Sequence, residues 1–155
     1  MQLAEEYRVK GAFLLNFTRF VEWPANSFKG PGDPIAICIL GANPFTAALE
    51  KAAQGVVADS RSLSYGRSDV EQAHQCHIVF VSASERKKMR AVVEAVQADS
   101  VLTVGESESF VAAGGVIEFR LEDNRVGMEI NAVAAKRAGL RISAKLLSLA
   151  QSGKR

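Results

Sequence analysis

Short apolar runs, separated by segments with helical spacing, are the main pattern along the chain. The clearest run covers residues 76–82 (CHIVFVS) and is rich in β-branched and aromatic side chains. Such a run is typical of a strand that is buried on both faces of a parallel sheet. Residues 35–40 and 101–105 have the same character. Residues 77–82 are therefore predicted to form the central strand, and residues 35–40 and 101–105 two further strands.

Apolar residues at a helical spacing lie between these strands. The longest segment, residues 3–23, has a wide arc of apolar and aromatic side chains opposite a polar side, which predicts a helix that cannot easily pass Pro24. Core packing explains this arc, with a partner-binding face as the alternative. Shorter helices are expected over residues 44–50, 84–96, 107–113, 132–138 and 140–151.

Two further strands, residues 116–121 and 126–130, flank a polar turn and predict an antiparallel hairpin. Residues 62–67 alternate weakly and are expected to form an edge strand. The fold class that follows is α/β with three layers: a mainly parallel sheet with antiparallel edge strands, and helices on both faces. The chain has no internal repeat and no long linker, so one domain is expected over residues 1–155.

Composition narrows the function classes. The net charge is +2, from 19 basic and 17 acidic residues, which favours neither nucleic acid nor an anionic membrane surface as the partner. No apolar run approaches the roughly 18 residues of a membrane span, so direct membrane insertion is not expected. The start of the chain is not a signal peptide, which leaves a cytoplasmic protein or one whose signal peptide has been removed.

A search for catalytic or metal-binding patterns yields no enzyme constellation. The turn at residues 41–44 lacks the glycines and the lysine of a nucleotide site. His74, Cys76 and His77 are possible metal ligands, but Cys76 and His77 would point to opposite faces of a strand. His77 is better interpreted as a hydrogen-bonded residue at a strand start. We therefore expect no catalytic residues, no metal and no cofactor.

Several short blocks, in this order, resemble the YfiR family. They cover nearly the whole chain: residues 7–17 (YRVKGAFLLNF), 20–24, 37–41, 43–45, 76–80, 102–105, 114–117, 129–131 and 140–147. Each block is weak alone, and their shared order carries the resemblance.

The resemblance implies a small periplasmic protein without a catalytic site, exported by a signal peptide that this chain would have lost. The best-known type represses a membrane-bound diguanylate cyclase, YfiN, by binding its periplasmic region, which lowers cyclic-di-GMP signalling. An outer-membrane lipoprotein, YfiB, can sequester that repressor. We therefore expect a periplasmic location, YfiN-like and YfiB-like partners, and a homodimer. A periplasmic protein that binds a small ligand or a metal is the alternative.

The resemblance also implies an intrachain disulfide between Cys38 and Cys76, with two buried free thiols as the alternative. The chain has no second cysteine pair, so redox behaviour that depends on one is not expected.

Apolar surface near Leu140, Ile142 and Leu146 is the expected partner-binding site. The alternative is that these side chains pack against the sheet.

Overall fold

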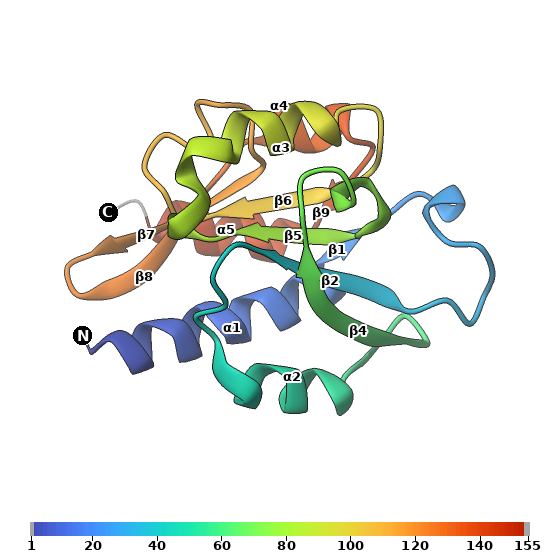
Figure 1. Cartoon of the computed structure of the whole chain (residues 1–155), viewed down its shortest axis with the longest axis horizontal. Coiled ribbons are helices and arrows are strands. Elements are labelled where there is room, and N and C mark those ends of the chain that lie inside the picture. The colour runs from blue at the N-terminus through green and yellow to red at the C-terminus, as the bar shows by residue number, and fades with distance from the viewer. Residues whose placement is uncertain (1, 154–155) are drawn as a thin grey trace.

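The structure, a computed structural model, describes residues 2–153 of the chain (Figure 1). The helices are α1 (Leu3–Phe20), α2 (Thr46–Gln54), α3 (Met89–Ala95), α4 (Ala132–Arg137) and α5 (Ala144–Gly153), with 3-10 helices η1 (Ala25–Ser27), η2 (Ala73–Gln75) and η3 (Ala83–Lys88). The strands are β1 (Val21–Glu22), β2 (Ile35–Leu40), β3 (Val57–Ala58), β4 (Arg61–Ser68), β5 (Ile78–Val81), β6 (Leu102–Gly105), β7 (Ile117–Glu122), β8 (Arg125–Ile130) and β9 (Arg141–Ile142).

A seven-stranded sheet forms the centre of the molecule, in the order β3-β4-β2-β5-β6-β7-β8. The five inner strands, β4, β2, β5, β6 and β7, run parallel to one another. The edge strands β3 and β8 run antiparallel to β4 and β7. β1 and β9 form a separate antiparallel pair. The predicted α/β class, with a mainly parallel sheet and antiparallel edges, is confirmed.

Helices cover both faces of the sheet, which confirms the three-layer prediction (Figure 1). On one face, Leu14 of α1, Leu49 of α2 and Leu146 of α5 pack into one core cluster with the central strands. On the other face, Val92 of α3 and Phe110 pack into a second cluster. Because β5 contributes to both clusters, its four residues are all buried, as its unbroken apolar run predicts.

Aromatic side chains join α1 to the sheet. The ring of Phe17 is fully buried and stacks on that of Phe119 in β7, with 6.0 Å between their centroids. Phe119 contacts Phe80 in β5, and Phe80 meets Phe45 edge-on at 4.9 Å. Offset and edge-on ring pairs add to the stabilisation from area burial alone. Core packing thus accounts for the most buried part of the predicted aromatic arc.

The ends of several predicted elements differ from the structure. α1 ends at Phe20 rather than at residue 23, because Val21 and Glu22 pair with Ile142 and Arg141. The same pairing delays the last helix to Ala144. Residues 107–113 form turns instead of a helix, and β4 lies inside the sheet because β3 covers its outer side. In each case a tertiary contact or a turn overrides the local helical or edge-strand pattern.

We predict that Phe17→Ala lowers the free energy of unfolding by about 3–5 kcal/mol, because it leaves a cavity beneath α1 that the surrounding rings cannot fill. Urea denaturation followed by circular dichroism measures the loss. Leu121→Ala, at a side chain that is 50% exposed, is the control and should cost below about 1 kcal/mol. A loss below about 1 kcal/mol at Phe17 itself would contradict this description of the core.

Candidate functional site

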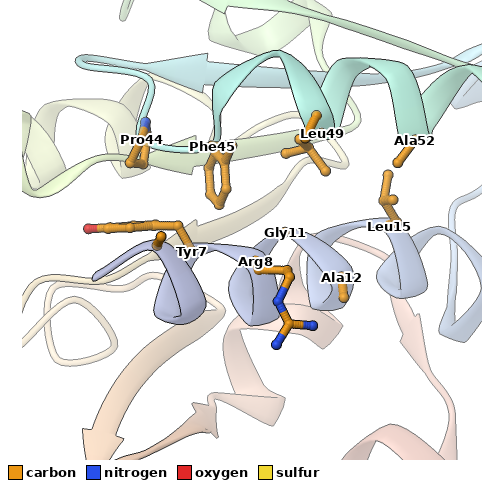
Figure 2. Close-up of a pocket in the computed structure, with 11 residues that line it drawn as sticks. Tyr7, Arg8, Gly11, Ala12, Leu15, Pro44, Phe45, Leu49 and Ala52 are labelled. Carbon is orange, nitrogen blue, oxygen red and sulfur yellow. The ribbon is translucent and has the colours of Figure 1, made fainter. Parts of the chain in front are cut away.

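An apolar groove lies between α1 and α2, with a volume of about 490 Å³ (Figure 2). Its lining residues come from these two helices and the turn before α2: Ala4, Tyr7, Arg8, Gly11, Ala12, Leu15, Pro44, Phe45, Ala48, Leu49 and Ala52. Apart from Tyr7 and Arg8, these residues are apolar or glycine. The volume and the lining are typical of a site that binds apolar groups with a few polar contacts.

Gly11 lies where α1 and α2 come close together. A Cβ atom at this position would lie 3.3 Å from Leu49 Cδ1 and 3.5 Å from Phe45 Cδ1. A larger side chain would therefore push α2 away from α1 and change the groove. Sequence reasoning did not identify this site. The available signal was the set of small residues on two neighbouring helices, Ala4, Gly11 and Ala12 on α1 and Ala48 and Ala52 on α2, which is common in helices that simply pack together.

A buried ionic cluster fixes α1 at the carboxyl ends of the central strands. Lys10 Nζ contacts Glu6 on its own helix and lies 2.9 Å from Glu106 Oε1, just after β6. The other oxygen, Glu106 Oε2, accepts a hydrogen bond from the backbone N–H of Ala83 at 2.9 Å. The side chains of Lys10 and Glu106 are 5% and 3% exposed. Removing one partner of such a pair leaves an uncompensated buried charge, so this cluster positions α1 firmly.

The hydroxyl of Tyr7 is hydrogen-bonded to Glu106 of the same cluster. Burial raises the pKa of the Tyr7 hydroxyl, and the nearby Glu106 carboxylate, to which it is hydrogen-bonded, raises it further. Tyr7 therefore stays neutral and contributes mainly its ring to the groove, where it meets Phe45 edge-on at 5.7 Å. Arg8 is left as the one charged residue among the described residues of the lining.

Cys38 and Cys76 form a disulfide on the opposite face of the sheet, as the resemblance implies, with an S–S distance of 2.02 Å. Cys38 lies in β2 and Cys76 just before β5, and these strands are neighbours in the sheet. The two Cα atoms are 6.2 Å apart, within the usual range for a disulfide. The bond thus ties two central strands together beside the second core cluster.

His77, the residue after Cys76, joins the sheet to the loop that precedes β2. Its Nδ1 accepts a hydrogen bond from the N–H of Ala36, and its Nε2 lies 2.9 Å from the carbonyl oxygen of Ser27. Nε2 therefore carries the proton and the imidazole is neutral. The ring stacks on Phe28 at 4.4 Å, and burial lowers the pKa of His77. The interpretation of His77 as a hydrogen-bonded residue at a strand start is confirmed.

The expected partner-binding residues lie mostly inside the protein. Leu140 and Leu146 are 5% and 1% exposed and belong to the main core cluster, and Ile142 is partly buried in β9. The alternative interpretation, packing against the sheet, accounts for Leu140 and Leu146. As buried side chains of the core, these two leucines are not accessible to a partner in this structure. On α5, Leu149 is the more exposed leucine, at 44%.

The possible metal ligands near the disulfide have other contacts. Cys76 is in the disulfide, His77 holds two backbone groups, and His74 Nδ1 lies 2.9 Å from the carbonyl oxygen of Glu71. Within residues 2–153, no three His, Cys, Asp or Glu side chains are grouped as metal ligands would be.

Among the helices of the described part of the chain, none has the length and apolar character needed to cross a bilayer.

Comparison with known proteins identifies a family. A family model described as YfiR/HmsC-like matches residues 7–151. Among curated proteins, no match is found. One similar solved structure is that of a conserved domain protein from Vibrio cholerae O1 biovar eltor str. N16961, with 12% sequence identity and a TM-score of 0.56. The alignment covers 75% of this chain and 53% of that one, so the chain spans about half the length of the solved structure. At this identity, the likeness supports the fold alone.

We predict that His77 makes the protein acid-sensitive. Because the pKa of His77 is lowered in the folded state, the unfolded chain binds a proton first as the pH falls below its ordinary value of 6.5. The stabilising contribution is complete above pH 6.5 and is lost as the pH falls from there toward the lowered pKa. The slope should approach about 1.4 kcal/mol per pH unit.

Urea denaturation between pH 7.5 and pH 4.5 tests this prediction. His77→Gln should lose the corresponding part of the slope, whereas His74→Gln, at an exposed histidine, should keep it. Identical pH profiles for the wild type and His77→Gln would contradict the assignment.

Loss of the disulfide should destabilise the fold by about 4 kcal/mol, because the bond closes a loop with a sequence separation of 38 residues. The measurement compares urea denaturation of the oxidised wild type with that of a Cys38→Ala/Cys76→Ala variant. Reductant added to the variant is the control and should change nothing. A difference below about 1 kcal/mol would show that the bond contributes little to stability.

Proposed function

The chain belongs to the YfiR/HmsC-like family, and from this premise we propose that it is a periplasmic regulatory protein that represses a membrane-bound diguanylate cyclase by binding the cyclase's periplasmic region. Repression would lower cyclic-di-GMP signalling. The observation that carries the proposal is the family match, which extends over residues 7–151. Membership of this family supports a periplasmic regulatory role, and the particular receptor and the repression are our inference.

The geometry of the molecule supports a binding role. The groove between α1 and α2 presents apolar surface on a well-anchored helix, since Lys10 and Phe17 hold α1 to the sheet. The groove contains no pair of titratable side chains of the kind that acid–base catalysis needs, among its described residues. An apolar, concave surface with one cationic residue is better suited to recognition than to chemistry.

Repression by binding requires a preference between two receptor conformations. The protein would lower cyclase output only to the extent that it binds the inactive conformation more tightly than the active one. A lipoprotein of the outer membrane, similar to YfiB, would relieve repression by competing for the same protein. A homodimer would present two receptor-binding surfaces and so raise the apparent affinity for a dimeric receptor.

The disulfide gives this proposal a redox component. Reduction would release Cys76, which is adjacent to His77, from β2 and so loosen the attachment of the loop that His77 holds. A less rigid protein must lose more conformational entropy when it binds, so reduction should weaken repression.

The second candidate function is binding of a small ligand, and the volume of the groove, about 490 Å³, is the observation that favours it.

We predict that the oxidised protein binds the purified periplasmic region of a membrane diguanylate cyclase from the same organism, as measured by calorimetry. Reductant should weaken this binding at least tenfold, which corresponds to about 1.4 kcal/mol. The Cys38→Ala/Cys76→Ala variant is the control, and its affinity should not respond to reductant. Equal affinity with and without reductant would make the disulfide structural only. Absence of binding in both states would refute the repressor proposal for that receptor.

A further inference from the structure

Two matching rows of residues border the groove between α1 and α2. On α1 the row is Ala4, Arg8 and Ala12, each four positions from the next. On the side of α2 it is Ala48 and Ala52, preceded by Pro44 in the turn before the helix. Residues four apart lie on the same side of a helix. On α1 the span of eight residues from Ala4 to Ala12 corresponds to about 12 Å along the helix axis, or just over two turns. The groove is therefore an elongated trough parallel to α1.

The floor of the trough is apolar and its walls are low. Figure 2 shows the side chains of Phe45 and Leu49 directed toward α1, with Tyr7 beneath Pro44 and Leu15 facing Ala52. Four of the six wall positions are alanine, so the walls rise little above the two backbones. Low walls let a third helix approach to the 8–10 Å that separates packed helices, with its apolar ridge between the two rows.

Arg8 is the charged residue at the α1 rim of this trough, and Figure 2 shows its side chain directed away from α2. It lies in the middle of the α1 row, is exposed, and has no ion pair with any residue in the described part of the chain. The polar end of Tyr7 is already hydrogen-bonded to Glu106, so it does not compete for a bound group. An occupant that extends from the trough over the α1 rim would lie beside Arg8, and this favours an occupant that brings a carboxylate to that point.

We propose that this trough binds an amphipathic helix of the receptor, with apolar side chains at i, i+4 and i+7 and one acidic side chain that pairs with Arg8. The inference rests on the proposed function, because the helix belongs to the periplasmic region of the cyclase. The length of the trough matches two helical turns, and the apolar floor matches the apolar face of such a helix. The lone cation gives the complex its register and orientation.

Paired variants test the proposal by calorimetry with the purified periplasmic region of the cyclase. Arg8→Glu reverses the charge in the trough, and Ala12→Trp fills its α1 side. Arg90→Glu and Ala91→Trp make the same changes at exposed positions in the region of α3, on the other face of the sheet. Both trough variants should bind at least tenfold more weakly, and both control variants should bind within twofold of the wild type. Thermal melting confirms that all four variants fold.

A charge exchange gives the sharper result. Each acidic residue on a predicted helix of the cyclase region is changed to lysine and tested against Arg8→Glu. One of these changes should restore at least tenfold of the lost affinity, and the same change should weaken binding to the wild type. Absence of any such rescue would overturn the pairing with Arg8.

The outcomes separate this inference from the proposed function. If the wild type binds and both trough variants bind equally well, the trough is not the interface, although the repressor proposal stands. If the wild type itself does not bind, the repressor proposal and the helix assignment both fail for that receptor. If sedimentation shows that Ala12→Trp converts a wild-type dimer to a monomer, the occupant is a second copy. If native mass spectrometry shows a small molecule that Ala12→Trp releases, the occupant is that ligand, and the helix assignment is overturned.

Discussion

The buried ion pair between Lys10 and Glu106 is the interaction on which the arrangement of this protein most depends. It joins the first helix to the carboxyl end of a central strand, and the remaining oxygen of Glu106 holds the N–H of Ala83 after another strand. Desolvation makes such a pair costly to form, but it is far more costly to break by removing one partner. Together with the stacking of Phe17 on Phe119, it determines where α1 lies and therefore where the groove beside α2 opens.

The opposite end of the same strands is held by different chemistry. The Cys38–Cys76 disulfide ties two neighbouring strands, and His77 joins the loop at Ser27 to the strand at Ala36. Phe28 stacks on His77, and the guanidinium of Arg61 lies 3.6 Å from the centroid of the Phe28 ring. A disulfide and a histidine with a lowered pKa thus lie next to each other along the chain. Disulfides respond to redox conditions and histidines to pH, and both conditions vary outside the cytoplasm. This fits a regulatory protein of the periplasm.

The sequence predicted the layers and the strand directions because buried parallel strands and amphipathic helices have strong periodic patterns. It was less successful where one contact decides the outcome. The pairing of Val21 with Ile142 ends one helix and delays another, and no local pattern indicates it. The leucines at 140 and 146 were expected at a surface because the last helix is short, but both are buried in the main core cluster. The groove was missed because alanines at positions such as 12 and 52 are equally typical of close helix packing.

We propose that this chain lowers the output of a membrane diguanylate cyclase from the periplasmic side. The most direct measurement reconstitutes the full-length cyclase in lipid nanodiscs, adds the oxidised protein, and follows cyclic-di-GMP formation from GTP. The rate should fall as the protein saturates its receptor, and Arg8→Glu at the same concentration should have much less effect. A cyclase rate that is unchanged at saturating occupancy of its periplasmic region would show that the chain is not its repressor.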